Sequence, residues 1–298
     1  MTETLRSLYT RAFRSLREAD CATPALDARL LISNAFGISP ESWLLRQDAA
    51  IDPKELAKTE KFIKRRADGE PVSRILGRRA FWTLDMEISP CVLDPRPDSE
   101  AVILAALKCI ENRPGPLSVL DLGTGSGCLL LAVLNERTDT NGIGIDRSEK
   151  ALEIARRNAQ KHGLADRATF ILGNWTDGIE DTFDLILSNP PYIPTDDIAN
   201  LDREVRDHDP CGALDGGPDG LDAYRSLAPR IARHLKSPGC AVLETGAGQL
   251  DDVRNIFVAS DLCIIHVEKD LSGTGRAIII SHESPVTGKI GSISFPRA

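Results

Sequence analysis

The feature that most constrains the fold of this chain is an apolar stretch that runs directly into a glycine-rich turn. Residues 119–127 read VLDLGTGSG, and residues 128–134 after them are apolar and helix-prone. Glycines in such a turn let the backbone approach a ligand closely. A second apolar stretch, residues 142–145, ends in Asp146, about 20 residues further on, where an acidic side chain in such folds hydrogen-bonds ribose hydroxyls. The pattern predicts a parallel α/β sheet that binds a nucleoside-containing ligand.

The spacing of the glycines bears on which nucleoside this is. The turn reads Gly-x-Gly-x-Gly with Asp121 just before it, whereas dinucleotide-binding turns read Gly-x-Gly-x-x-Gly. S-adenosylmethionine carries a sulfonium and an ammonium group but no pyrophosphate, so a nearby carboxylate favours it over NAD. The alternative is a close-packed strand-to-helix turn without a ligand. The predicted cofactor contacts in this region are Asp121, Gly123, Thr124, Gly125, Ser126, Gly127 and Asp146.

A second motif, Asn189-Pro190-Pro191-Tyr192, follows the largely apolar stretch 183–187. An amide or amino nitrogen on sp² carbon is a weak nucleophile, because its lone pair is delocalised, so catalysis must orient it. The Asn189 side-chain carbonyl can accept one N–H, and a backbone carbonyl of Asn189 or Pro190 can accept the other. Tyr192 can cover the face of a planar group. The alternative is a proline-rich turn at a strand end.

The predicted sheet brings these two motifs together. In a doubly wound sheet, ligands bind beyond the carboxyl ends of the strands at the switch point, which the first and fourth strands of this pattern flank. The glycine turn ends the first strand and Asn189 ends the fourth. Residues 167–173 predict the third strand, and Asn174 and Trp175 follow it at the same edge. We expect Asn174 to hydrogen-bond the adenine ring and Trp175 to lie against it, unless Trp175 is a packing residue.

The rest of the chain divides into a helical region and a mixed region. Apolar residues at helical spacing predict helices over residues 1 to about 70, and Pro53 suits the first turn of one of them. Residues 75–92 predict extended structure, and residues 100–110 predict a helix. The predicted boundaries are 1–74 for an N-terminal helical domain, 75–97 for a linker with a β-hairpin, 98–283 for the sheet-containing domain and 284–298 for a C-terminal tail.

The last two predicted strands decide the type of sheet. Residues 261–268 and 276–281 are separated only by a short, glycine-containing turn. Because so short a connection cannot contain a crossover helix, the two strands must be antiparallel. This antiparallel pair matches the seven-stranded, Rossmann-like sheet of class I methyltransferases, with its antiparallel last strand, rather than an all-parallel dehydrogenase sheet.

From about Gly69 to Ser281 the chain resembles the protein-(glutamine-N5) methyltransferases of the PrmC/HemK type, which modify peptide chain release factors. The resemblance rests on an ordered set of motifs. These are GEP at 69–71 with Gly77 and Phe81, PRPDSE at 95–100, DLGTGSG at 121–127, NPPY at 189–192, ALDGG at 213–217, DGL at 219–221 with Tyr224 and Arg225, and LETG at 243–246 with Gln249. Two stretches depart from the usual pattern: Asp98-Ser99-Glu100 stands where Glu-Thr-Glu is commoner, and Asp209-Pro210 stands where Glu-Pro is usual.

The resemblance implies methyl transfer from S-adenosylmethionine to the side-chain amide nitrogen (N5) of a glutamine, in the GGQ motif of a class-1 release factor. It implies that residues 123–127, Asp146 and Trp175 contact the cofactor, that residues 189–192 hold the glutamine, and that the helical domain helps to hold the release factor. The predicted catalytic residues are Asn189, Pro190 and Tyr192, with Pro191 as a further substrate contact and Asn189 also beside the cofactor. The alternatives are a ribosomal-protein glutamine methyltransferase, a nucleic-acid N-methyltransferase and a non-enzymatic binding module.

Composition narrows the class of partner. A formal net charge of −8 and a pI near 5.3 argue against strong direct binding of nucleic acid. The densest basic stretch, Lys61 to Arg79, is expected to be a solvated helix face, or alternatively a contact for an acidic or RNA-bound partner. We expect a cytoplasmic protein, because the chain has no long apolar run and no signal-peptide core. The 7 cysteines and 5 histidines are dispersed, which predicts neither a disulfide framework nor a catalytic metal.

Overall fold

The computed structural model describes residues 4–39, 42–48 and 50–282, so the predicted tail at 284–298 lies outside the described residues. The chain divides into two compact units. The helical unit consists of Met1–Arg78 together with Asp202–His208, and the sheet unit consists of Arg79–Leu201 together with Asp209–Ala298. A short segment from late in the sequence therefore folds with the N-terminal part of the chain.

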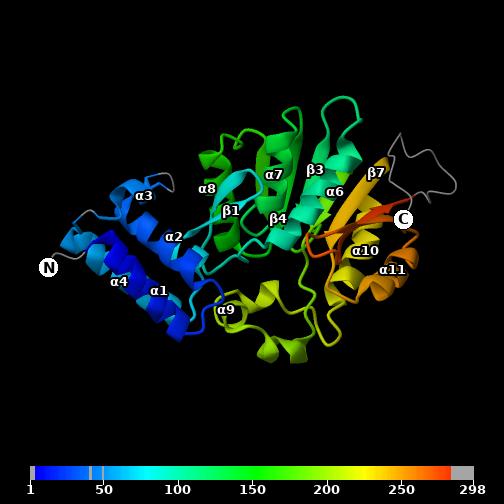
Figure 1. The fold of residues 1–298 in the computed structure, drawn as a ribbon. Helices are drawn as coiled ribbons and strands as arrows, with labels where there is room; N and C mark the ends of the chain where they lie inside the picture. Colours follow the sequence, from blue (N-terminus) through cyan, green and yellow to red (C-terminus); the bar gives the residue numbers. More distant parts are fainter. Residues whose placement is uncertain (1–3, 40–41, 49, 283–298) are drawn as a thin grey trace. The chain divides into compact units, whose positions relative to one another are not determined.

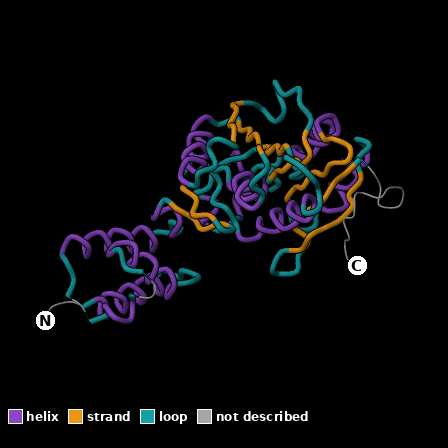
Figure 2. Tube along the Cα trace, turned by 90° about the horizontal axis from the view of Figure 1, so that it is seen from above, coloured by secondary structure: helices purple, strands orange, loops and turns teal. Residues whose placement is uncertain are grey.

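The described residues between 4 and 77 form helices joined by loops (Figure 2). The helices of the helical unit are α1 Leu5–Glu18, α2 Pro24–Phe36, α3 Trp43–Arg46, α4 Pro53–Ala67, α5 Val72–Leu76 and α9 Arg203–Arg206. The Asp52 carboxylate caps α4 by accepting the Lys54 N–H, and Gly37 ends α2 in the left-handed conformation. Apolar side chains of α1 such as Leu8 and Leu16 face Leu31 in one buried cluster. The predicted helices of this region are thus present.

Two predictions for the helical unit were wrong. Residues 75 and 76, expected to be extended, form the last turn of α5, which Gly77 ends with a φ of 68°. The basic stretch is not a solvated face throughout, because Arg66 is only 3 % exposed and donates to the carboxylates of Asp27 and Glu204. A guanidinium can be buried there because two carboxylates compensate its charge.

The sheet unit is built on a seven-stranded sheet with the strand order β5-β4-β3-β6-β7-β9-β8 (Figure 1). The strands are β3 Ser118–Leu122, β4 Asn141–Asp146, β5 Ala168–Leu172, β6 Phe183–Ser188, β7 Leu235–Glu244, β8 Cys263–Lys269 and β9 Gly275–Ser281. The first five pair in parallel, and β9 runs antiparallel to both β7 and β8. The predicted fold class is confirmed, as is the antiparallel pairing of the last two strands. The strand order reverses at β3, so the switch point lies between β3 and β6.

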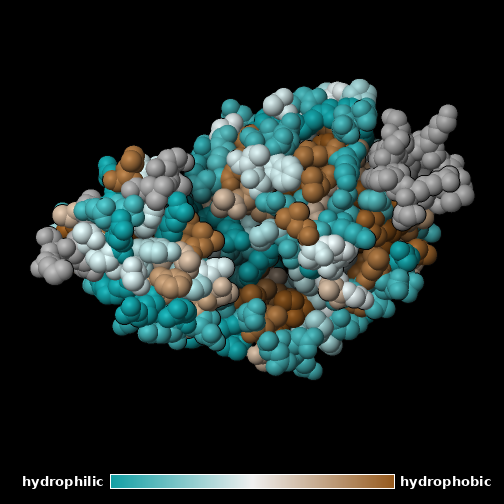
Figure 3. All heavy atoms as spheres, in the orientation of Figure 1, coloured by the Kyte–Doolittle hydropathy of each residue, from teal (hydrophilic) through white to brown (hydrophobic). Residues whose placement is uncertain are grey.

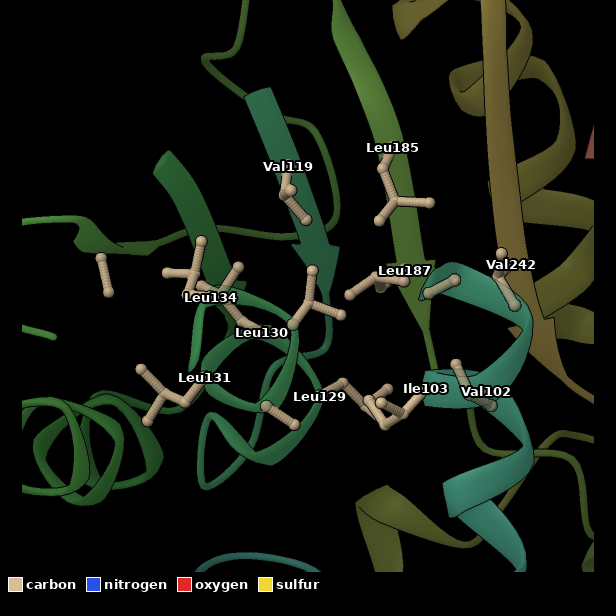
Figure 4. Packing of buried hydrophobic residues seen from close by; sticks show 14 of the residues in the cluster. Val102, Ile103, Val119, Leu129, Leu130, Leu131, Leu134, Leu185, Leu187 and Val242 are labelled. Atoms are coloured by element: carbon tan, nitrogen blue, oxygen red, sulfur yellow. The ribbon is translucent and has the colours of Figure 1, made fainter. Parts of the chain in front are cut away.

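Alternate residues of the central strands build the two cores of this unit. On one face Val119, Leu185 and Val242 pack with apolar residues of the helices α6 Glu100–Ile110, α7 Cys128–Glu136 and α8 Glu149–Lys161 (Figure 4). On the other face Leu120 and Ile186 pack with α10 Asp222–His234 and α11 Leu250–Val258. Because β3 and β6 are covered on both faces, both strands read as nearly continuous apolar runs. This double cover makes the strands a rigid base for the loops at their carboxyl ends.

The remaining elements are short. A two-stranded sheet, β1 Arg78–Phe81 and β2 Leu84–Glu87, precedes the main sheet, and the 3₁₀ turns η1 Pro97–Ser99, η2 Thr195–Asn200 and η3 Cys211–Ala213 lie in connecting segments. Hydrophilic residues cover most of the face shown in Figure 3, with apolar residues in separate patches between them. Among the residues described, no helix combines the length and the apolar character needed to cross a bilayer.

Candidate active site

A cavity of about 260 Å³ lies at the carboxyl ends of β3, β4 and β6, within the sheet unit. Its walls come from the glycine loop, from the end of β4, from residues 173–175 and from the start of the NPPY segment. The predicted site residues that line it are Gly123, Thr124, Gly125, Ser126, Asp146, Asn174, Trp175, Asn189 and Pro191, whereas Asp121, Gly127, Pro190 and Tyr192 are not in its wall. The two motifs, separated by more than sixty residues in the sequence, thus face one cavity.

The glycine loop has a conformation that depends on its glycines. Gly123, Gly125 and Gly127 have φ values of +74°, +55° and +82°, in the region that L side chains rarely adopt. Backbone N–H groups of Gly123 and Thr124 donate to the Ile145 carbonyl, each at 2.9 Å. The loop is therefore fastened to the end of β4 and leaves its outer surface to the cavity.

Asp146 is held at the edge of the cavity by two backbone donors. Its Oδ2 accepts the Gly125 N–H at 2.9 Å, and its Oδ1 accepts the Ser148 N–H at 2.9 Å. Each carboxylate oxygen has a second lone pair. The side chain can therefore accept a vicinal pair of ribose hydroxyls without losing the bonds that orient it.

Asp121 lies beneath the glycine loop with its carboxylate 1 % exposed. The Thr124 hydroxyl donates to Oδ2 at 2.6 Å, and Oδ1 has no partner at normal hydrogen-bonding geometry among the described residues. Burial raises the pKa of Asp121 to about 7, although the Thr124 bond opposes the shift. A buried carboxylate with an unpaired oxygen favours a cationic ligand, so these residues fit the sulfonium and ammonium groups of S-adenosylmethionine.

Trp175 both packs and lines the cavity. Its backbone is left-handed, with a φ of 56°, which is uncommon for a residue other than glycine. A Cβ on Gly123 would lie 3.5 Å from Trp175 Cζ3, so the indole ring lies close to the start of the glycine loop. Part of the ring also packs against the core of the α10 and α11 face. Both of the roles considered for this tryptophan are consistent with its position.

Asn189 continues directly from β6 and belongs to a chain of buried hydrogen bonds. Its Nδ2 donates to Ser99 Oγ at 3.2 Å, and Ser99 Oγ donates to Glu244 Oε2 at 2.5 Å. Tyr192 Oη donates to the other oxygen of Glu244 at 3.1 Å. Burial raises the pKa of Glu244, while the bonds from Ser99 and Tyr192 lower it in part. One carboxylate therefore connects both ends of the NPPY segment.

The Tyr192 side chain is not part of the cavity wall but packs against the core. Burial and the nearby Glu244 raise the pKa of its phenol above the ordinary value, and its ring packs against the α10 and α11 core. Gln249 Nε2 donates to the Tyr192 carbonyl at 2.9 Å, which holds the backbone of this segment. Stacking of Tyr192 on a planar substrate group stays a prediction.

Three features of the site are not predicted from the sequence. Ser99 and Glu244 stand in the PRPDSE and LETG motifs, which assign neither of them a role, and Gly144 lies so close to the glycine loop that a Cβ there would be 2.8 Å from Thr124 Oγ1. The Cys128 thiol also lines the cavity. Burial raises the pKa of that thiol to about 12, so it is neutral near pH 7 and unsuited to nucleophilic attack. Within the described ranges, no cluster of three or more His, Cys, Asp or Glu side chains is suited to hold a metal ion.

The arrangement combines a site for a cationic nucleoside with a hydrogen-bond acceptor for an N–H group. The side-chain oxygen of Asn189 receives no hydrogen bond from a described residue, and Asn189 lines the same cavity as Asp146 and the glycine loop. A ligand on the loop and an amide at Asn189 would be neighbours. This geometry suits transfer of a group between the two by proximity and orientation.

Comparisons with known proteins match both units. A family model described as a PrmC N-terminal domain matches residues 7–77, and one described as a methyltransferase domain matches residues 116–283. The release factor glutamine methyltransferase of Rhodospirillum rubrum is 45 % identical to this chain over 275 residues, which cover 92 % of this chain and 84 % of that protein. The release factor glutamine methyltransferase of Caulobacter vibrioides is 42 % identical over 280 residues, covering 94 % and 96 %.

The fold of the sheet unit also has a counterpart among solved structures. The crystal structure of a methyltransferase from Pyrococcus furiosus matches with a TM-score of 0.51 and 19 % identity, covering 68 % of this chain and 91 % of that chain. At this level of identity the likeness concerns the fold alone.

Proposed function

Because the chain belongs to the family of release factor glutamine methyltransferases, we propose that it methylates the side-chain amide nitrogen (N5) of a glutamine in the GGQ motif of a class-1 peptide chain release factor, with S-adenosylmethionine as methyl donor. The observation that carries this proposal is the position of Asn189 in the wall of the same cavity as the glycine loop and Asp146. The helical unit, expected from the sequence to span residues 1–74, would help to hold the release factor.

The cofactor would be held by groups whose chemistry matches its parts. Asp146 would accept the ribose hydroxyls, Trp175 and Asn174 would contact the adenine, and Asp121 would compensate the positive charge of the methionine moiety. When bound, S-adenosylmethionine supplies an electrophilic methyl group on sulfur. The three loop glycines keep side chains out of the space that this ligand needs.

The acceptor glutamine would be oriented by carbonyl groups. Asn189 Oδ1 accepts one amide hydrogen, and a backbone carbonyl of Asn189 or Pro190 accepts the other, so that the nitrogen lone pair is directed at the methyl group. In an in-line displacement the nitrogen–carbon bond forms while the carbon–sulfur bond breaks, and its electron pair stays on sulfur. The carbonyl dipoles stabilise the positive charge that develops on nitrogen. The methylated nitrogen then releases its proton to water.

Methyl transfer to purified acceptors in parallel tests this function. We expect the chain to transfer a radiolabelled methyl group from S-adenosylmethionine to a class-1 release factor, and to lose this transfer when the GGQ glutamine of the factor is replaced. Labelling of a ribosomal protein or of a nucleic acid, with none of the release factor, would instead support one of the two other acceptors.

The substitution Asn189→Ala tests the site assignment within that assay. It removes the amide acceptor but no predicted contact to the ribose, so we expect turnover to fall by about 100-fold or more while the Kd for S-adenosylmethionine changes little. Methylation of the release factor at the wild-type rate by this variant would contradict the role of Asn189.

A further inference from the structure

The Asn189 amide is not held by the NPPY segment itself but by a serine from the turn before α6. Ser99 is 2 % exposed, and its Oγ accepts the Asn189 Nδ2–H at 3.2 Å. The same Oγ donates to Glu244 Oε2 at 2.5 Å, and Glu244 is 1 % exposed at the end of β7. Three segments separated widely in the sequence therefore meet at the acceptor side of the cavity, whose lining includes Ser99.

The protons available in the hydrogen bonds from Asn189 through Ser99 to Glu244 determine which end of the Asn189 amide faces Ser99. A serine hydroxyl has one proton, and an ionised carboxylate can only accept. The Ser99 proton is therefore committed to Glu244, and Ser99 Oγ can offer only a lone pair to Asn189. The amide must present its NH₂ group to Ser99, and its Oδ1 is left free to accept a hydrogen bond in the cavity.

We propose that Ser99 and Glu244 are positioning residues that keep the Asn189 carbonyl oxygen directed at the acceptor amide. The proposal rests on the methyl transfer to glutamine proposed above. An asparagine amide in the opposite orientation would present N–H donors to the N–H donors of the substrate, and the amide torsion alone has little preference between the two orientations. The Ser99–Glu244 pair supplies that preference.

The donors around Glu244 support its role as an acceptor. Burial raises the pKa of Glu244, and the neighbouring Asp98 adds to that shift, whereas the hydrogen bonds from Ser99 and Tyr192 and the Arg276 guanidinium favour the ionised carboxylate. Tyr192 Oη donates to Oε1 at 3.1 Å, so both carboxylate oxygens have donors. If Glu244 were neutral and donated to Ser99, the Ser99 proton could turn to Asn189 Oδ1 and hold the amide in the unproductive orientation.

The first test replaces the serine. In Ser99→Ala the acceptor for Nδ2 is lost, and we expect kcat on the full-length release factor to fall about tenfold or more, with the Kd for S-adenosylmethionine unchanged in calorimetry. Ser99→Thr keeps the hydroxyl and should retain most of kcat. A wild-type kcat in Ser99→Ala would overturn the proposal. If the wild-type chain itself failed to methylate the factor, the proposed function would fail instead, so the two failures are distinguishable.

A matched control exists at the opposite end of the sheet. Ser118 Oγ donates to the buried carboxylate of Asp184 at 2.9 Å, at the first residue of β3 and away from the cavity. Ser118→Ala removes the same kind of hydrogen bond and should lower the melting temperature without lowering kcat. Equal losses of kcat in Ser118→Ala and Ser99→Ala would reduce Ser99 to a general structural role and overturn the proposal.

The second test reverses the direction of the hydrogen bonds from Asn189 to Glu244 in two steps, and only the final double variant keeps the net charge. In Asn189→Asp a carboxylate faces Ser99, which has no proton to offer because Glu244 takes it, so kcat should fall at least tenfold. Adding Glu244→Gln supplies an N–H donor to Ser99 and frees the Ser99 proton for the new carboxylate. The double variant should therefore be more active than Asn189→Asp alone. A double variant as inactive as Asn189→Asp, or less active, would contradict the proton arrangement.

Discussion

At the scale of single residues, the candidate site contains two aspartates whose carboxylates have different hydrogen-bond partners. Among the described residues, Asp121 Oδ1 has no partner at normal hydrogen-bonding geometry, and Asp146 has both oxygens held by backbone N–H groups. The first carboxylate is costly to keep ionised in the interior, and the second is already stabilised. The two aspartates are therefore suited to different parts of one ligand, a cationic part and a hydroxyl-bearing part.

The Asp121 carboxyl predicts how cofactor affinity depends on pH. Burial raises its pKa to about 7, and a cationic ligand favours the ionised form, so binding must displace a proton at lower pH. The Kd for S-adenosylmethionine should therefore rise as the pH falls from 7.5 to 5.5, by up to about tenfold per pH unit. Calorimetry at several pH values measures this. Asp121→Asn should bind more weakly and without that slope, and a flat wild-type profile would contradict the prediction.

Asp146→Ala should act on cofactor binding at every pH. The change removes the acceptors for the ribose hydroxyls and the anchor of the Gly125 N–H, so we expect a loss of affinity of about 1.5–3 kcal/mol, as for hydrogen bonds to a charged group. Calorimetric titration with S-adenosylhomocysteine reports this loss without turnover. An unchanged affinity would remove Asp146 from the ribose site.

At the scale of elements, the glycine loop and β4 pack closely against each other because two positions of β4 are glycines. Gly144 lies beside Thr124 and Phe170, both within 2.9 Å of where its Cβ would stand, and Gly142 lies in the same way beside Leu130. The strand can therefore approach the loop and α7 closely only because both positions lack a side chain. The close approach brings the end of β4, and with it Asp146, to the cavity.

Two alanine substitutions on β4 distinguish an effect on the glycine loop, and so on cofactor affinity, from an effect on packing alone. Gly144→Ala should destabilise the fold by about 1–3 kcal/mol through overpacking and should also weaken S-adenosylmethionine binding, because Thr124 must move. Gly142→Ala crowds the flexible end of Leu130 instead, so it should lower stability alone. Denaturant unfolding and calorimetry measure the two effects. Equal cofactor affinities for the two variants would contradict the specific role of Gly144.

At the scale of the whole molecule, the chain passes between its two units at three points, after residues 78, 201 and 208. The segment Asp202–His208 lies in the sequence between the NPPY motif and the ALDGG motif, yet it folds with the helical unit. Arg66 of α4 holds it there by donating to Glu204 while it also pairs with the buried Asp27. A segment that follows the NPPY motif in the sequence is thus part of the helical unit.

The burial of Arg66 between Asp27 and Glu204 allows a prediction of which helices lose protection first when these ion pairs are removed. Arg66→Ala leaves the Asp27 carboxylate buried without its cation, which costs about 3–5 kcal/mol when one member of a buried pair is removed. Hydrogen exchange should rise in α9 and in α2, while the strands β3 and β6 keep their protection. Glu204→Gln, at a side chain that is 41 % exposed, should have a smaller effect on stability. Unchanged exchange in α9 of Arg66→Ala would contradict this account.

Local pattern and composition predicted much of this protein. The order of strands and helices, the antiparallel pairing after residue 261, the glycine loop and the NPPY motif all follow from apolar periodicity and from residues with special backbone properties, which act over a few positions in the chain. The same signals indicated most of the predicted site residues that line the cavity, because the carboxyl ends of parallel strands meet at one edge. Asp121, Gly127, Pro190 and Tyr192 are not in its wall.

Tertiary structure alone decided the features that depend on distant partners. No local signal in the sequence indicates that Ser99 and Glu244 meet behind Asn189, that Arg66 is buried between Asp27 and Glu204, or that one oxygen of Asp121 is left unpaired. The sequence does not show whether a charged side chain is solvated or buried. Its pKa and its partners are set by the residues that surround it in the folded protein. The sequence by itself therefore determined the fold and the class of chemistry, and the packed structure decided how the reacting groups are oriented.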